Sequence, residues 1–267
     1  MTGLNPLQST LMPPFSGMGA LRVATYNIHK GVRGVGPGKR LEIHNLGLAV
    51  EAFDADLIFL QEVRAFHTRE ARRFDRTSFG WPAQGQADSL APEGYDVAYR
   101  TNAVTRGGEH GNALLSRWPI GDIGHHDVSD HAFEQRGLLH APVVWNGSLV
   151  HAVVVHLGLV HSSRVRQVQR LARFIETEVP ADAMLVVAGD FNDWGERLDG
   201  PMQALGLARA IAPSRKRSAT FPSLAPVFAL DRFYLRGLSC VNTMVPRGMV
   251  WARMSDHLPL VAELEPL

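Results

Sequence analysis

Short apolar segments rich in β-branched residues recur along the chain, and turn residues bound each of them. Segments of this kind are typical of β-strands. They predict strands at residues 21–27, 56–62, 111–120, 136–145, 148–159, 183–192, 228–237 and 258–264. Between two of these strands lies Asn146-Gly147, a pair that favours a tight hairpin because both residues tolerate positive φ.

Two stretches show helical spacing instead. In the first, Leu46, Ala49, Val50 and Phe53 fall on one face. The second has a longer apolar face, made by Val165, Val168, Leu171, Ala172, Ile175 and Val179. Ser162 or Ser163 can cap its N-terminus. Strands outnumber helices, and hairpins mix with strand–helix–strand units. The pattern therefore predicts a mixed, largely antiparallel sheet system with helices on the outside.

Irregular segments are expected where these patterns fail. Residues 77–94 and 99–111 are rich in glycine, proline and polar residues, and we interpret them as surface loops. Residues 1–20 contain no lysine or arginine, and prolines interrupt them, so they do not resemble a signal peptide. We predict a flexible leader at 1–20, followed by a single domain at 21–267.

Composition narrows the class of protein without identifying it. The chain has 267 residues, of which 45% are hydrophobic and 20% charged, as in an ordinary globular protein. Its single cysteine excludes an internal disulfide, and no uncharged apolar run is long enough to span a bilayer. We therefore expect no transmembrane segment, a cytoplasmic location and a monomer.

The charge pattern bears on the partner. A formal net charge of +1 argues against a strongly basic nucleic-acid binder, although a local patch can hide within a neutral total. Dense basic stretches occur only at residues 64–76 and 214–217. The first of these predicts either a substrate-facing basic helix or an ordinary solvated helix face.

Polar side chains stand at the ends of several predicted strands. Asn27 and Glu62 end two of them, His156 lies near the end of a third, Asp190 and Asn192 lie at the end of a fourth, and Asp256-His257 precede the last. Each alone has a structural explanation, such as a turn cap, an ion pair or a core histidine. An extended continuation of the strand would place Asp190 and Asn192 on one face. Together these residues form an oxygen-rich set of the kind that Mg²⁺ prefers, with histidines beside it. Such a set suits hydrolysis of a phosphate ester.

The same segments, in the same order, resemble the motifs of the endonuclease/exonuclease/phosphatase superfamily. They read TYNIHKG, FLQEV, VVHLG, GDFN, LDRFYL and SDHLPL, and the resemblance runs from about residue 21 to residue 265. NIHKG, HGNALLSR, VHLGL and GDFNDW further resemble a small bacterial branch. The resemblance implies an α+β, DNase I-like fold. This is a four-layered α/β sandwich in which two packed, mostly antiparallel β-sheets are flanked by helices.

The resemblance also implies a metal site. Glu62 corresponds to the principal Mg²⁺ ligand, with Asn27 beside it, and Mn²⁺ is a plausible substitute ion. Asp256 would serve the same metal or a second one. The ion would polarise a phosphoryl oxygen and stabilise the leaving oxyanion.

Catalytic roles follow from the same comparison. Asp190 would orient and deprotonate the attacking water, and Asn192 would hydrogen-bond a non-bridging phosphate oxygen. His257 would contact the phosphoryl group, with Asp231 fixing its tautomer. His156 would donate a hydrogen bond to the phosphate.

Five further residues are candidates for contacting the phosphate or the rest of the substrate. Arg136 could clamp the phosphate. The others lie in or beside the motifs and could shape the substrate pocket: His29, Lys30, His110 and Asn112.

The natural substrate stays open at this point. A phosphodiester or phosphomonoester hydrolase is the leading hypothesis, and its substrate could be a small diester, a phospholipid headgroup or a nucleic acid. Within that class, a DNA or RNA endonuclease or exonuclease is the first alternative, and a phosphodiesterase acting on phospholipid headgroups at the membrane surface is the second. An adaptor that has lost its chemistry is the last. The near-neutral charge and the lack of recognisable DNA-gripping loops favour a small or lipidic substrate.

Overall fold

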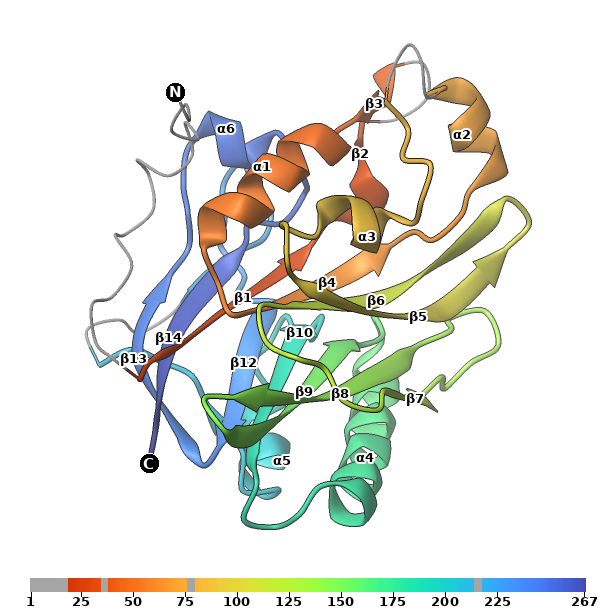
Figure 1. Ribbon diagram of the computed structural model, residues 1–267. Helices are drawn as coiled ribbons and strands as arrows, with labels where there is room; N and C mark the ends of the chain where they lie inside the picture. Colours follow the sequence, from red (N-terminus) through yellow and green to blue (C-terminus); the bar gives the residue numbers. More distant parts are fainter. Residues whose placement is uncertain (1–18, 35–37, 76–79, 214–217) are drawn as a thin grey trace.

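Two six-stranded sheets packed face to face form most of the computed structural model, which describes residues 19–34, 38–75, 80–213 and 218–267 (Figure 1). The first sheet has the order β13 (Leu238–Met244), β14 (Leu260–Pro266), β1 (Leu21–Asn27), β4 (Leu57–Val63), β6 (Gly108–Ser116) and β5 (Asp96–Thr105). The second has the order β11 (Ala208–Arg209), β12 (Asp231–Arg236), β10 (Met184–Asp190), β9 (Ser148–His156), β8 (Gly137–Trp145) and β7 (Gly124–Asp127). Neighbouring strands are antiparallel except β1 with β4 and β9 with β10. A small ribbon pairs β2 (Val32–Arg33) with β3 (Arg40–Leu41).

Helices cover the outer faces of both sheets. Over the first sheet lie α1 (Ile43–Phe53), α3 (Gln86–Leu90) and α6 (Met249–Ala252), and over the second lie α4 (His161–Glu178) and α5 (Asp199–Gln203) (Figure 1). The short helix α2 (Thr68–Arg73) lies beside the tip of the β5–β6 hairpin, and the 3-10 turn η2 (His29–Gly31) follows β1. Helix, sheet, sheet and helix make four layers. The predicted DNase I-like sandwich is confirmed.

The hydrophobic core has two parts. The larger part fills the space between the sheets and the space under α1. Between the sheets, Phe59 of β4 and Phe233 of β12 meet edge to face, with ring centroids 6.2 Å apart. The smaller lies between the second sheet and α4. Because both faces of the central strands are covered, these strands are buried throughout and mostly apolar rather than alternating, which made β1 and β10 recognisable in the sequence.

The errors in the predicted secondary structure come from short or half-exposed elements. The predicted surface loop at residues 77–94 contains the helix α3, whose five residues are too few to show helical periodicity. The other errors concern edge strands. Residues 99–111, predicted to be a surface loop, form most of the β5–β6 hairpin. β5 is an edge strand with half-exposed side chains, so it lacks the apolar run that identifies a buried strand. β7 and β13 are also edge strands and escaped prediction for the same reason.

Two local predictions had different outcomes. The Asn146-Gly147 hairpin is confirmed, with φ of 47° and 79° at the two residues. The predicted serine cap of α4 is wrong, because the helix begins at His161 and no side chain caps it. The Ser163 hydroxyl instead donates to Asp130 Oδ2 at 2.7 Å.

Two of the predicted segments fall wholly or mostly outside the described residues. The predicted leader falls outside except for residues 19 and 20, and the basic segment 214–217 falls outside completely. Among the described helices, none combines the length and the apolar character that crossing a membrane requires.

A pair of buried histidines on the second sheet predicts acid sensitivity. His140 Nε2 lies 2.9 Å from His151 Nδ1, and the rings are nearly parallel. Burial, and then the neighbouring His151 and His126, lower the pKa of His140 to about 4. Because the folded pKa lies below the unfolded value of about 6.5, this contribution to stability is complete above pH 6.5 and is lost as the pH falls toward 4.

We expect His140→Asn to flatten the dependence of stability on pH. Between pH 7.5 and 5, the wild type should lose about 2 kcal/mol more unfolding free energy than the variant. Urea unfolding at both pH values measures this difference. Equal losses in the two proteins would contradict the assignment of the His140–His151 pair as an acid-sensitive element.

Candidate active site

Three polar side chains of the second sheet stand in a row at one edge. β9 and β10 run parallel, and their register places His156 beside Asp190. β12 runs antiparallel to β10 and begins at Asp231, which pairs with Asp190. The register of three adjacent strands therefore brings these three side chains together.

The first sheet ends at the same place. β1 and β4 run parallel and end with Asn27 and Val63, so Asn27 lies beside Gln61 and next to Glu62. The segment before β14 crosses this edge, where the Ser255 hydroxyl donates to the Asn27 carbonyl at 2.7 Å. That bond holds Asp256 and His257 over the ends of both sheets.

One oxygen is the meeting point of the two sheets. Asp190 Oδ2 lies 3.1 Å from Asn27 Nδ2, 3.5 Å from His156 Nε2 and 3.7 Å from His257 Nε2. The Asp190 carboxylate is almost completely buried. We call Asn27, His156, Asp190, Asp231 and His257 the strand-end cluster.

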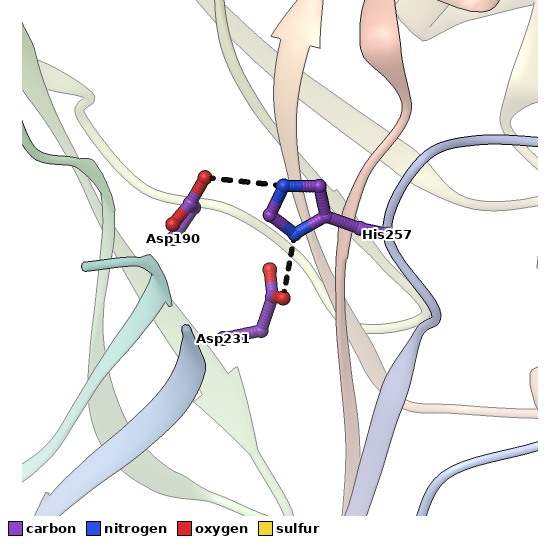
Figure 2. A group of neighbouring side chains, drawn as sticks. All are labelled: Asp190, Asp231 and His257. Atoms are coloured by element: carbon purple, nitrogen blue, oxygen red, sulfur yellow. Dashed lines mark hydrogen bonds and ion pairs between the residues drawn. The ribbon is translucent and has the colours of Figure 1, made fainter. Parts of the chain in front are cut away.

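His257 lies between two carboxylates, as Figure 2 shows. Its Nδ1 is 2.8 Å from Asp231 Oδ2, and its Nε2 faces Asp190. Burial alone would lower the pKa of His257, but the charges of Asp231 and Asp190 and the hydrogen bond to Asp231 raise it to about 10. The imidazole is thus a cation near neutral pH, with Nδ1 donating to Asp231 and Nε2 available to donate.

His156, in contrast to His257, is uncharged. It is buried, and burial followed by the charge of Arg136 lowers its pKa to about 4 despite the carboxylates of Asp190 and Glu62. It is therefore neutral near pH 7. The cluster contains one charged and one neutral imidazole, both directed at the same carboxylate oxygen.

A second group of charges lies beside the cluster. Glu62 Oε2 is 2.8 Å from Lys30 Nζ, and Asp256 Oδ1 is 3.2 Å from His29 Nδ1. Burial would raise the pKa of Glu62. The positive charge that His156 gains at low pH, then the charge of Lys30 and its hydrogen bond, hold the pKa of Glu62 well below its usual range. We call Glu62, Asp256, His29 and Lys30 the Glu62 group.

The backbone is strained around these groups. Positive φ occurs at His29 (46°), Lys30 (60°), Glu62 (56°) and Asn192 (48°), all beside the site. Non-glycine residues rarely adopt this conformation, which costs about 1–3 kcal/mol each and tends to cluster at functional sites. The backbone conformation at these four residues therefore lowers the stability of the folded protein.

The Glu62 group offers the ligands that a hard divalent cation prefers. It has two carboxylates, and Asn27 Oδ1 lies nearby, accepting only a backbone N–H from His29 at 3.1 Å among the described residues. Lys30 pairs with the first carboxylate, and the His29 ring lies against the second. These residues fit Mg²⁺ or Mn²⁺ by donor type.

A second set of ligand atoms also lies close together. One atom each from Asp190, Asp231 and His257 lies within 4.8 Å of the others. This set fits a cation less well, because a metal would have to displace the proton that His257 shares with Asp231. Hydrogen bonding explains the arrangement without an ion.

Asn192 corrects one step of the sequence interpretation. The chain does not continue extended beyond Asp190. It turns, so that the Asn192 backbone N–H donates to Asp190 Oδ1 at 2.9 Å, and Asn192 Nδ2 donates to the Leu157 carbonyl at 2.9 Å. The expectation of a common strand face for Asp190 and Asn192 is wrong, although the turn still keeps the two residues adjacent.

Arg136 and His110 line a pocket beside the site. Arg136 Nη2 is 3.3 Å from Glu134 Oε1, and its Nε donates to the Leu157 carbonyl at 3.3 Å. Burial, and then the charge of Lys30, lower the pKa of His110 to about 4, opposed by Glu62. Both residues are therefore close enough to act on the charges of the site.

Asn112, predicted to shape the substrate pocket, lies between the two sheets instead. It is completely buried, and its Nδ2 donates to the carbonyls of Gly137 at 3.0 Å and Val154 at 3.2 Å. Its side chain joins the first sheet to the second. In this arrangement it holds the two halves of the site in register.

Asp193 and Thr220 complete the surroundings. Asp193 Oδ2, the last acid of GDFND, forms a buried ion pair with Arg232 Nη1 at 3.0 Å and supports the turn after β10. Thr220 was not predicted from the sequence. Its hydroxyl donates to Asp231 Oδ2 at 2.6 Å and helps to hold that carboxylate against His257. The segment around Thr220 has no periodic pattern or motif that could have identified it.

Comparison with known proteins identifies the family. A model of the endonuclease/exonuclease/phosphatase family matches residues 24–257. The Escherichia coli K12 protein YbhP, described as uncharacterized, is 35% identical over 258 residues, which cover 95% of this chain and 99% of YbhP.

Solved structures agree as well. An endonuclease/exonuclease/phosphatase from Beutenbergia cavernae superposes with a TM-score of 0.71 at 21% identity, covering 93% of this chain and 72% of that one. A mannosyl-6-phosphatase from Bacteroides thetaiotaomicron has a TM-score of 0.64 at 17% identity, covering 91% and 99%. By its sequence match and its fold, the chain belongs to the endonuclease/exonuclease/phosphatase family.

Proposed function

We propose that this protein is a divalent-metal-dependent phosphoesterase that hydrolyses a phosphodiester or phosphomonoester by in-line attack of water. The observation that carries the proposal is the meeting of Asn27, His156 and His257 on Asp190 Oδ2, directly beside the carboxylates of the Glu62 group. A buried base next to an oxygen-rich cation site is what metal-assisted hydrolysis requires.

Glu62 would hold Mg²⁺, with Asn27 and Asp256 as further ligands. Bound there, the ion would supply Lewis-acid polarisation of a phosphoryl oxygen and neutralise the leaving oxyanion. Lys30 and His29 now contact these carboxylates, so a bound ion would have to displace both side chains from them. Mn²⁺ satisfies the same ligands.

The chain's own residues perform the proton transfers. Asp190 accepts a proton from the attacking water, and Asn27 and the Asn192 backbone N–H hold its carboxylate in place meanwhile. His257, kept protonated by Asp231, donates from Nε2 to a phosphoryl oxygen as negative charge builds on it. His156 donates from the neutral ring, and Arg136 adds positive charge beside it.

The site is compatible with several classes of phosphate ester. The structural neighbour named for a sugar phosphate supports monoester chemistry on this fold. A nuclease and a headgroup phosphodiesterase at a membrane surface are also compatible with the site. An adaptor without chemistry gives no reason for a charged imidazole held between two buried carboxylates. The single domain, the monomeric state and the cytoplasmic location stay predictions.

An activity panel tests the proposal. With Mg²⁺ we expect the protein to hydrolyse at least one of bis-p-nitrophenyl phosphate, p-nitrophenyl phosphate, plasmid DNA, RNA, sphingomyelin and inositol phosphates. EDTA should abolish this activity, and added Mg²⁺ or Mn²⁺ should restore it. Folded protein that turns over none of them with either metal, or whose activity resists EDTA, would contradict the proposal.

A further inference from the structure

A basic pocket lies at the tip of the β5–β6 hairpin. It has a volume of about 840 Å³ and is lined by His67, Thr68, Arg69, Arg72, Arg73, Thr105, Arg106 and Gly107. The arginine-dense sequence segment therefore faces a hollow that it shares with Arg106, and is not merely a solvated helix face. None of the described residues that line this pocket is acidic.

The local fold directs the cations outward. The one acid of α2, Glu70, is buried, and Lys39 and Arg64 both form ion pairs with its carboxylate. The arginines of α2 are thus left without the acid of their own helix. Arg73 is partly engaged, because it donates to the Lys39 carbonyl at 3.4 Å.

Several donors in the pocket stay available. The guanidinium groups of Arg69, Arg72 and Arg106 make no hydrogen bond or ion pair with another described residue, and all three side chains are exposed. His67 Nδ1 accepts the Glu70 backbone N–H at 3.2 Å, so the proton of the neutral ring is on Nε2, which lies beside Gly107. Guanidinium groups gathered without a carboxylate are suited to bind phosphate.

The pocket is connected to the active site through one strand. Thr68 donates to the Gly107 carbonyl at 2.8 Å, and Gly108 begins β6. His110 lies two residues further along β6, about 7 Å away. The next residue, Gly111, pairs with Val63, which follows Glu62. A substrate that extends from Glu62 along β6 would reach the arginines.

We propose that this basic pocket binds a phosphate group of the substrate other than the one that is cleaved. The assignment rests on the proposed phosphoesterase function and narrows its substrate to compounds with at least two phosphates. Arg69 of α2 and Arg106 of the turn between β5 and β6 would donate to the remote phosphate, and His67 Nε2 would add a neutral donor. The pocket would thereby increase affinity and fix direction without taking part in the bond cleavage.

An anionic membrane is the rival partner. Val104 and Phe133 are 70% and 87% exposed and line the adjoining pocket with His110 and Arg136. Apolar and cationic side chains together are a feature of membrane-surface binding. The concave shape of the basic pocket favours a discrete phosphate over a flat bilayer, so membrane binding is an outcome that would overturn the proposal.

The test is the affinity of the full chain for fluorescein-labelled hexathymidylate, with thymidine 5′-monophosphate as competitor. Fluorescence anisotropy is measured in EDTA, so that the probe is not cleaved. We expect the double variant Arg69→Gln/Arg106→Gln to weaken binding about tenfold or more at low salt. The slope of log affinity against log salt should fall by about 1.4, since each phosphate contact on a single strand contributes about 0.7. Arg173→Gln, an exposed arginine of α4, is the matched control and should change neither value.

Two outcomes would overturn the inference. One is hexathymidylate binding that the double variant does not weaken beyond the control, or that is no tighter than binding of the monophosphate. The other is loss of binding to phosphatidylglycerol vesicles in the double variant with oligonucleotide affinity unchanged. Hydrolysis of bis-p-nitrophenyl phosphate, which has one phosphate, should stay within about twofold in the double variant. If the wild type hydrolyses no substrate of the panel, the proposed function fails, while the binding result still decides the role of the pocket.

Discussion

Asp190→Asn is expected to reduce kcat about a thousandfold, while the fold and the affinity for Mg²⁺ are kept. The substitution changes almost no volume and retains a carbonyl oxygen for Asn27 to donate to, but it removes the group that accepts the proton of the attacking water. General-base catalysis contributes about 10²–10⁴-fold to a rate, which sets the size of the loss. Because Asp190 is separate from the Glu62 group, adding Mg²⁺ should not restore activity.

The measurement is kcat for the best substrate of the panel at saturating Mg²⁺, beside Mn²⁺ binding followed by electron paramagnetic resonance. Asp122→Asn, an exposed carboxylate in the loop before β7, is the matched control and should leave both values unchanged. A variant that keeps more than about a tenth of the wild-type kcat would show that a different group accepts the proton.

The parts of the fold that could be predicted are those in which one short segment shows both the strand and its functional residue. β1 combines an uninterrupted buried run with a polar last residue, so both the strand and Asn27 could be identified from seven letters. In the same way, β10 is a buried run that ends in a polar residue, Asp190. Such strands are covered on both faces, and burial imposes the apolar run directly on the sequence.

The parts that escaped prediction depend on partners distant in the chain. Asn112 looks like a pocket residue in its motif, yet the carbonyls that it binds belong to β8 and β9. Thr220 acts on Asp231 across a segment without a pattern. The position of the Asn192 side chain is set by the Leu157 carbonyl, 35 residues earlier in the chain. These interactions exist only after the sheets have packed, so no local sequence pattern contains them.

Glu62→Gln should give the opposite signature to Asp190→Asn. The amide has nearly the volume of the carboxylate but no charge, so the site would lose its principal anionic ligand and Lys30 would lose its partner at 2.8 Å. Changes even to groups that only support metal ligands cost about 10–100-fold in metal affinity or activity, and loss of a ligand charge should cost at least as much. We therefore expect the Mg²⁺ concentration for half-maximal activity to rise at least about tenfold.

The decisive comparison is activity across a Mg²⁺ titration, with Glu51→Gln on the exposed face of α1 as the matched control. In Glu62→Gln, most of the lost kcat should return at high Mg²⁺, because Asp190, His156 and the His257–Asp231 pair are untouched. In Asp190→Asn none should return. The two variants separate cation binding from water activation only if Glu62 and Asp190 act as different groups, as their different partners indicate. Equal and mild losses in both variants, or an unchanged Mg²⁺ requirement in Glu62→Gln, would contradict this division of roles.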